Sequence, residues 1–362
     1  MNPRPVTLLL LTALCGCPSE PSPDAAPAKS ASAAATGSAT ASASAAVALP
    51  PAPPLPADPP YFPPIPAPED NPLTPEKVEL GSLLFFDKRL GKDDAWSCES
   101  CHYLDKGLGD GKTLSPKADG KTNSRHSPTL FNVAYAKEFY WDGRKPTLES
   151  QILAAWTGQM GGDTKAVSEK LEKIPGYAAR FARAFGGPAN EERIVQALAS
   201  FVRTLRAGNS AWDRFEKGDT TAVGEDAQRG QKLFTGKASC SLCHAPPLYS
   251  DYAFHNVGVG FGEGVTEPDL GRGTVTKEPK EEGAFKTPSL RGVSLHPPYF
   301  HDGSAATLEA AVDYMLSGGH ANEHLDPQLK KVELSEDEKK DLLAFLESLA
   351  PAEPPAKKPT LP

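Results

Sequence analysis

Three observations predict a mainly α-helical chain built from two related domains. Apolar residues recur at three- and four-residue spacings along several segments, and we find no convincing alternation of the kind that predicts a β-strand. A stretch around Trp141 recurs around His301, and its anchor residues are separated by the same number of positions each time. The pentapeptide Cys-x-x-Cys-His also occurs twice, once in each predicted domain.

The first helix is expected to begin after Thr74, a good N-cap that precedes a proline and a glutamate. Leu80 and Leu84 then fall on one face of this helix, where they can join a core. A second helix is expected after Asn190, because residues 194–205 carry apolar side chains at core spacing. Both helices therefore belong to the first of the two predicted domains.

The N-terminal residues predict an exported lipoprotein. Arg4 precedes an apolar run over residues 6–14, which is typical of a secretory signal peptide and too short to span a membrane. The next residues, Leu14-Cys15-Gly16-Cys17, resemble the cleavage box of bacterial lipoproteins. We therefore assign residues 1–17 to a lipoprotein signal peptide with acylated Cys17, which would anchor the protein to a membrane facing the periplasm, or at the cell surface.

Composition divides the remaining chain into four parts. Residues 18–71 are rich in Ala, Ser and Pro and are expected to form a disordered tether. Two domains of common size follow at 72–220 and 221–350, and residues 351–362 are expected to be a loose proline-rich tail. The net charge of −8 argues against nucleic acid as a partner.

The two pentapeptides have the spacing that covalent attachment of haem c requires. Thiols about one helical turn apart can reach both vinyl groups on one porphyrin edge, while the adjacent imidazole binds the iron. A pair of zinc knuckles is the alternative, but such cysteine pairs normally lie close together in sequence, and these lie in different halves. We predict two cytochrome-c-like domains with two haem c groups, attached through Cys98, Cys101, Cys240 and Cys243 and ligated by His102 and His244.

The repeat aligns the two domains residue by residue. Residues 127–149 correspond to residues 287–309, and the helices that follow begin with the same Thr-Leu-Glu sequence. Upstream, Gly81-x-x-Leu84-Phe85 corresponds to Gly230-x-x-Leu233-Phe234. One haem-binding unit has therefore been used twice.

The two copies differ at the position that faces the iron from the distal side. The second copy has Met315, whose thioether can complete the coordination of an iron already held by His244. The matching residue of the first copy is Ala155, which cannot bind iron. We therefore predict that one haem is a six-coordinate electron carrier, and that the haem on His102 is open to an exogenous ligand.

With these residues the chain resembles the bacterial di-haem cytochrome c peroxidases and their MauG-like relatives, from Thr74 to Leu349. The matching segments read LGSLLFFDKRL, SCESCH, SPTLFN, FYWDGR, FHNVGV, KTPSLRGV, YFHDG and TLEAAVDYM. The resemblance implies that hydrogen peroxide reacts at the first haem and that electrons enter at the second, which has Met315 as distal ligand. It also implies a small cytochrome c or a cupredoxin as electron donor.

The resemblance assigns catalytic roles to three further residues. Trp141 matches the tryptophan that lies between the two haems of the family, and Gln151 matches its distal glutamine. Gln159 falls where the family has its catalytic glutamate. An amide can position peroxide by hydrogen bonding but cannot take its proton.

Two other departures from the family concern the resting state and calcium. Residues 103–125 contain no histidine, although many of these peroxidases have one there that caps the resting iron. We therefore expect a first haem that is open without reductive activation. The asparagine that binds an inter-domain calcium in the family falls at His126, beside the expected carbonyls of His296 and Pro298. Imidazole is a poor ligand for so hard a cation, so the sequence leaves calcium binding open.

Three functions are compatible with these residues. The first is a peroxidase that reduces hydrogen peroxide to water. The second is the oxidation of a protein substrate by a MauG-like enzyme, although that branch has a tyrosine where this chain has Met315. The third is a di-haem electron-transfer cytochrome with no substrate, which the missing glutamate favours.

Overall fold

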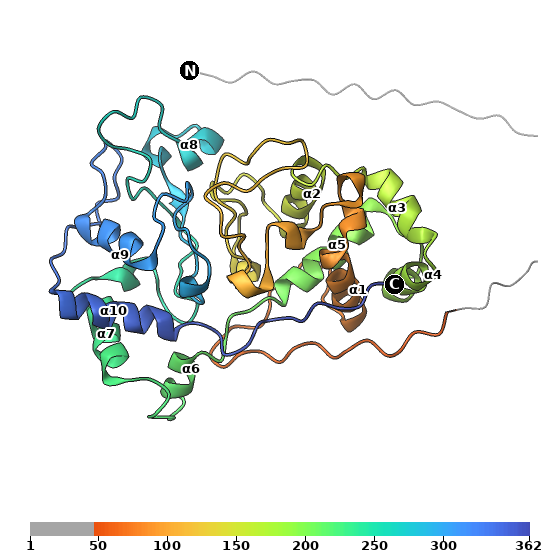
Figure 1. Cartoon of the computed structure of the whole chain (residues 1–362), viewed down its shortest axis with the longest axis horizontal. Coiled ribbons are helices and arrows are strands. Elements are labelled where there is room, and N and C mark those ends of the chain that lie inside the picture. Colours follow the sequence, from red (N-terminus) through yellow and green to blue (C-terminus); the bar gives the residue numbers. More distant parts are fainter. Residues whose placement is uncertain (1–46) are drawn as a thin grey trace, which may run out of the picture. The chain divides into compact units, whose positions relative to one another are not determined.

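The computed structural model describes residues 47–362, and these residues are mainly helical, as the sequence predicts (Figure 1). The predicted signal peptide, Cys17 and the first part of the predicted tether lie outside the described residues. None of the helices among residues 47–362 has the length and apolar character needed to cross a membrane.

Ten α-helices occur in this part of the chain, and short 3-10 turns and loops connect them. In the first half they are α1 (Pro75–Phe86), α2 (Leu148–Gly158), α3 (Thr164–Glu172), α4 (Pro175–Phe185) and α5 (Glu191–Arg203). In the second half they are α6 (Ala211–Glu216), α7 (Glu225–Thr235), α8 (Gly271–Thr276), α9 (Leu308–Ser317) and α10 (Glu336–Ser348). Two short antiparallel strands, β1 (Phe254–His255) and β2 (Phe285–Lys286), pair in the register His255 to Phe285.

The predicted helix starts are confirmed by their caps. The Thr74 side chain accepts a hydrogen bond from the backbone N–H of Lys77, 3.3 Å away. The Asn190 side chain accepts one from the N–H of Arg193 at 2.8 Å and opens α5. That helix ends at Arg203, so Leu205 follows the helix, although it is buried as predicted.

Two hydrophobic cores divide the helices. The first core contains α1 and α5 and is built from residues between Leu80 and Ala207. The second contains α7 and α10 and is built from residues between Trp212 and Leu349. The chain therefore buries one core in each predicted haem domain, which agrees with the internal duplication, although the exact domain boundaries stay predictions.

The repeated glycines explain how the same helix pair forms in each core. A Cβ atom at Gly81 would lie 1.9 Å from the carbonyl oxygen of Ala197, on the facing helix α5. A Cβ atom at Gly230 would lie 1.9 Å from the carbonyl oxygen of Asp341, on α10. Only glycine permits these backbones to approach so closely, so the repeat conserves a helix contact as well as a haem motif.

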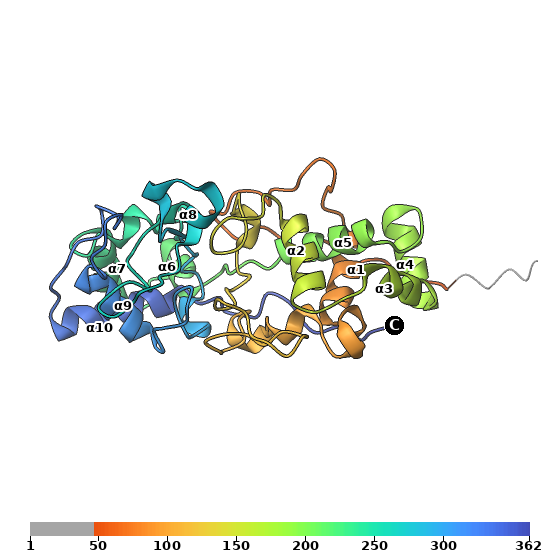
Figure 2. The same cartoon turned by 90° about the horizontal axis from the view of Figure 1, so that it is seen from above.

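The two proline-rich segments make more defined contacts than a loose tether and tail would. Phe62, in the N-terminal segment, is buried with the Arg291 guanidinium 4.5 Å from its ring centroid, and Tyr135 donates a hydrogen bond to the Pro63 carbonyl at 2.9 Å. The C-terminal segment leaves α10 and runs back along the first half of the chain (Figure 1 and Figure 2). There Lys358 pairs with Glu99. Residues 47–71 and 351–362, which the structure describes, contain no helix or strand, as their composition predicts.

Candidate haem site

One cavity of about 640 Å³ is lined by both pentapeptides. Residues between 123 and 144 and between 285 and 301 line it, and the helices α2 and α9 contribute side chains to it. The structure therefore brings together residues that lie far apart in the sequence. All the predicted site residues line this cavity: Cys98, Cys101, His102, Trp141, Gln151, Gln159, Cys240, Cys243, His244 and Met315.

The first pentapeptide forms a tight turn that orients its imidazole. Cys98–Ser100 is a 3-10 turn, and the backbone N–H of His102 donates back to the Cys98 carbonyl at 3.2 Å. Nδ1 of His102 lies 2.8 Å from the carbonyl oxygen of Leu108, so Nδ1–H donates and Nε2 keeps its lone pair. Burial lowers the pKa of His102, which favours the neutral form that binds iron.

The second pentapeptide repeats this arrangement. Cys240–Leu242 is a 3-10 turn, and the Nδ1–H of His244 donates to the Tyr249 carbonyl at 2.9 Å. Burial again lowers the pKa of His244. All four pentapeptide thiols are free of disulfide bonds, as haem attachment requires. The paired thiols, the oriented imidazoles and the shared cavity fit two haem c groups.

The distal positions of the two halves lie on matching helices. Thr147 caps α2 by accepting from the Ser150 N–H at 3.1 Å, and Thr307 caps α9 by accepting from the Ala310 N–H at 3.1 Å. Ala155 on α2 and Met315 on α9 both line the cavity. The cavity is thus lined by the methyl group of Ala155 on α2 and by the thioether of Met315 on α9.

Two glutamines accompany Ala155 on the side of the first haem site. Gln151 has a buried side-chain oxygen, Oε1, without a hydrogen-bond partner among the described residues. Gln159 follows α2 directly, and its backbone N–H donates to the Ala155 carbonyl at 2.9 Å. Both side chains line the cavity, as does buried Met160.

Trp141 lies where the two halves meet. Its indole Nε1–H donates to the backbone carbonyl of His126 at 2.9 Å, and its own carbonyl accepts from the Lys286 N–H at 2.8 Å. His301, the counterpart of Trp141 in the repeat, accepts at its carbonyl a hydrogen bond from the His126 N–H at 2.7 Å. Its ring stacks on Phe285 with 3.5 Å between the ring centroids.

Sequence reasoning missed an ion-pair network next to Trp141. Arg125 pairs with Asp142 at 2.6 Å and with Asp269 at 2.7 Å. Arg144 also pairs with Asp142, at 2.9 Å. The network joins the Trp141-Asp142-Gly143 turn to the segment before α8 through Arg125, which lies 144 residues before Asp269 in the sequence. No local pattern around Arg125 indicates such a distant partner.

Sequence reasoning also missed a half-buried lysine on β2. Lys286 lines the cavity, and its Nζ donates to the Glu138 carbonyl at 2.7 Å. Burial lowers the pKa of Lys286 to about 8. The position belongs to the KTPSLRGV segment, which could have suggested a role in the site but not the burial of the charge.

The residues at the implied calcium position present nitrogen atoms to the cavity. Nδ1 of His126 lies 2.8 Å from the Lys112 carbonyl, so Nδ1–H donates, and the buried Nε2 has no partner among the described residues. Nε2 of His296 is also buried without such a partner. Calcium binds oxygen ligands, so these side chains do not fit it, and we derive no role for calcium.

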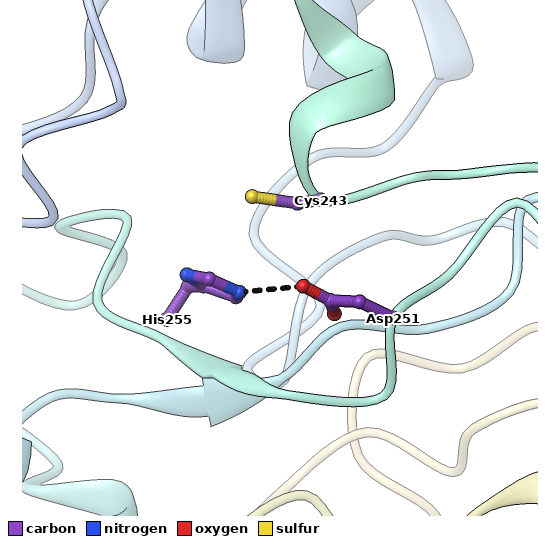
Figure 3. Close-up of side chains that lie close together, drawn as sticks. All are labelled: Cys243, Asp251 and His255. Carbon is purple, nitrogen blue, oxygen red and sulfur yellow. Dashed lines mark hydrogen bonds and ion pairs between the residues drawn. The ribbon is translucent and has the colours of Figure 1, made fainter.

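A second cluster that resembles a metal site lies beside the second pentapeptide (Figure 3). Ligand atoms of Cys243, Asp251 and His255 lie within 4.8 Å of one another. The Cys243 thiol and the neighbouring carboxylates raise the pKa of His255 to about 10. Attachment of haem converts the Cys243 sulfur to a thioether, which leaves the imidazole paired with carboxylates, so we do not assign a metal to this cluster.

The fold and the cavity define a c-type cytochrome with two haem sites. A sequence profile described as "Di-haem cytochrome c peroxidase" matches residues 75–221. The methylamine utilization protein MauG of Methylorubrum extorquens is 42% identical over 298 residues, which cover 81% of this chain and 83% of that protein. Cytochrome c551 peroxidase of Nitrosomonas europaea is 35% identical over 296 residues, which cover 80% and 85%.

A solved structure agrees with these relatives. The crystal structure of a MauG-like protein associated with microbial copper homeostasis matches with a TM-score of 0.78 and 32% identity, over 82% of this chain and 96% of that one. The chain belongs to the di-haem cytochrome c peroxidase family, which includes the MauG-like proteins. Its members bind two c-type haems, and this chain has the residues to hold both.

Proposed function

We propose that this protein is a peroxidase that reduces hydrogen peroxide to water at the His102 site. Electrons from a small cytochrome c or a cupredoxin would enter at the site of His244 and Met315. The observation that carries this proposal is the difference between Ala155 and Met315 at matching positions of one cavity. One site has room for peroxide, and the other can be closed by a thioether.

The haems, when bound, supply the redox chemistry that cleaves the O–O bond. The chain's own contribution on the reactive side is to leave space at Ala155 and to offer hydrogen bonds. The unpartnered Oε1 of Gln151 can accept a hydrogen bond from a peroxide O–H, and the Gln159 amide can hold the second oxygen. Neither amide can accept a proton, so both act by orienting the substrate.

Trp141 is proposed to couple the two sites electronically. Its indole is fixed by the hydrogen bond to His126, and its backbone is fixed by the bond from Lys286. Both contacts restrict the ring where the two domains meet. A tryptophan held in this way can conduct electrons from the Met315 side to the His102 side without large rearrangement.

Oxidation of a protein substrate is the second candidate function. It is favoured by the 42% identity to a MauG protein. The thioether of Met315 disfavours it, because the resemblance implies a tyrosine at that position in the MauG-like branch. A di-haem electron-transfer cytochrome is the third candidate, and binding of cyanide to one haem alone would favour an enzyme over such a carrier.

We also propose that the mature protein is a lipoprotein on the periplasmic side of a membrane. Export is supported by haem c chemistry, because the family is matured outside the cytoplasm. The proposed anchor, Cys17, lies outside the described residues. Labelling of cells with a fatty-acid probe would test it, with Cys17→Ala as the unlabelled control.

Steady-state turnover tests the proposed activity. The purified di-haem protein should oxidise a reduced small cytochrome c or cupredoxin in proportion to the hydrogen peroxide added. Trp141→Phe tests the role of the indole, because it keeps an aromatic ring but removes the indole N–H. This variant should turn over more slowly than the parent. Absence of peroxide-dependent oxidation with either class of donor would contradict the proposal and favour the other two candidates.

A further inference from the structure

His255 lies between two carboxylates, that of Asp251, drawn in Figure 3, and that of Asp326. Its Nε2 is 3.0 Å from Asp251 Oδ2, and its Nδ1 is 2.6 Å from Asp326 Oδ2. All three side chains are at least partly buried, with exposed fractions of 14% for His255, 28% for Asp251 and 16% for Asp326. A neutral imidazole could donate to only one carboxylate, so with both Asp251 and Asp326 ionised this geometry favours the imidazolium form.

Asp251 belongs to the side of the site that holds His244. Its backbone N–H donates to the Cys243 carbonyl at 2.8 Å, so it is fixed directly to the pentapeptide. One oxygen of its side chain, Oδ1, accepts from the Ala253 N–H at 2.9 Å, and the other faces His255. These two hydrogen bonds hold Asp251 in place independently of its contact with His255.

Asp326 belongs to the side of the site that holds Met315. It lies in the loop that follows α9, and the Val332 N–H joins this loop to the Leu316 carbonyl at 2.8 Å. Five residues of the loop line the cavity together with Met315: Asp326, Gln328, Leu329, Lys330 and Val332. The bond from His255 to Asp326 thus reaches the segment that supports the distal helix.

We infer that His255 is a positioning residue that holds the loop after α9, and with it Met315, against the second haem site. The inference rests on the proposed function, since it takes Met315 as a ligand of the second iron. Hydrogen bonds between charged partners are roughly twice as strong as those between neutral ones. Loss of the imidazolium would also leave two carboxylates facing each other, and their repulsion would favour opening of the loop.

Tyr314 provides a matched control for general loosening of this region. Its hydroxyl donates to the Val257 carbonyl at 3.0 Å, so it ties α9 to the segment that follows β1. This bond joins nearly the same two segments, and it lies next to Met315, but it involves no charge. The same hydroxyl also accepts a hydrogen bond from the His320 N–H at 3.3 Å, so Tyr314→Phe removes both bonds and keeps the aromatic ring.

The experiment titrates the oxidised di-haem protein with free imidazole and follows the methionine-sulfur to iron charge-transfer band. Imidazole can also bind the open first haem, but only an iron ligated by methionine contributes to this band. We expect His255→Gln to lose half of the band at an imidazole concentration about tenfold lower than the parent, because a charge-assisted hydrogen bond is lost. Asp326→Asn should shift the midpoint in the same direction, and Tyr314→Phe should leave it near the parent value.

The outcomes separate the inference from the function on which it rests. A parent protein with no such band would overturn both the ligation by Met315 and the positioning role of His255. A band that is present but equally resistant to imidazole in the parent and in His255→Gln would overturn only the positioning role of His255. An equal shift in Tyr314→Phe would also overturn it, because general loosening would then explain the effect.

Discussion

At the scale of single residues, one difference between the two haem sites is the pair Ala155 and Met315. Ala155 and Met315 occupy matching positions on α2 and α9, and both line the cavity. The proximal sides are alike, because His102 and His244 each donate Nδ1–H to a backbone carbonyl. We propose that the difference between an open iron and a capped iron depends on this distal residue.

Met315→Ala should abolish the methionine-sulfur charge-transfer band of the oxidised protein, because no second thioether lies at the matching place. Met160→Leu is the control, since Met160 also lines the cavity but on the side of the first site. The band should survive in this control. Visible absorption spectroscopy decides between the two methionines, and a band that persists in Met315→Ala would refute the assignment.

Gln159→Glu should raise the rate of the reaction with peroxide. A positioned acid–base group typically contributes ~10² to 10⁴-fold, and the amide at this place contributes none of that. Gln151→Ala should lower the rate by removing a hydrogen-bond acceptor. Stopped-flow mixing with peroxide measures both, and Gln159→Ala serves as the control that changes the side chain without adding an acid. Equal rates for Gln159→Glu and the parent across the accessible pH range would show that another group handles the proton.

The buried pair of Arg291 and Asp213 predicts a pH-dependent stability. Their atoms are 2.8 Å apart, and both side chains are almost fully buried. Although burial favours the neutral acid, the bonds from Arg291 hold the pKa of Asp213 below its ordinary value. The stabilisation is therefore fully present above the unfolded pKa and is lost as the pH falls through the lowered folded pKa.

Arg291→Met should reduce the free energy of unfolding by about 3–5 kcal/mol at neutral pH, since it leaves a buried carboxylate without its partner. The difference from the parent should shrink below about pH 4, where the carboxyl group becomes protonated. Urea unfolding at several pH values measures this. Arg229→Met removes an exposed pair with Asp341 and should change stability little. A difference that does not depend on pH would contradict the account.

At the scale of elements, each core depends on a close approach between two helices. Helix α1 packs on α5 at Gly81, and α7 packs on α10 at Gly230. The repeat of these glycines could be found in the sequence. The helix contacts that require these glycines could not be predicted, because the facing residues Ala197 and Asp341 lie more than a hundred positions away and show no pattern of their own.

Gly81→Ala should destabilise the first domain by about 1–3 kcal/mol or more, because the new methyl group would collide with the α5 backbone. Gly158→Ala is the matched control. Gly158 lies at the end of α2 with no heavy atom within 4 Å of an added Cβ, so the same substitution should be neutral or slightly stabilising. Thermal unfolding of the di-haem protein measures both variants. A Gly81→Ala protein as stable as the control would show that the helices can separate without cost.

At the scale of the whole molecule, the sequence predicted the mainly helical class, the helices after Thr74 and Asn190, and the haem motifs that line the cavity, but not the contacts that join distant segments. Motifs and the repeat carry local information, so the pentapeptides and Met315 could be located. The pairing of Arg125 with Asp269, and of His255 with Asp326, arises only when the chain folds. Composition likewise predicted segments without secondary structure, but it could not predict that Phe62 would be buried.

We propose that one haem of the resting protein is open and that the other is capped. Electron paramagnetic resonance of the fully oxidised protein tests it most directly, because the spin state reports the sixth ligand of each iron. We expect one high-spin signal from the His102 site and one low-spin signal from the site of His244 and Met315. Two low-spin signals would contradict it, because another side chain would then close the first site.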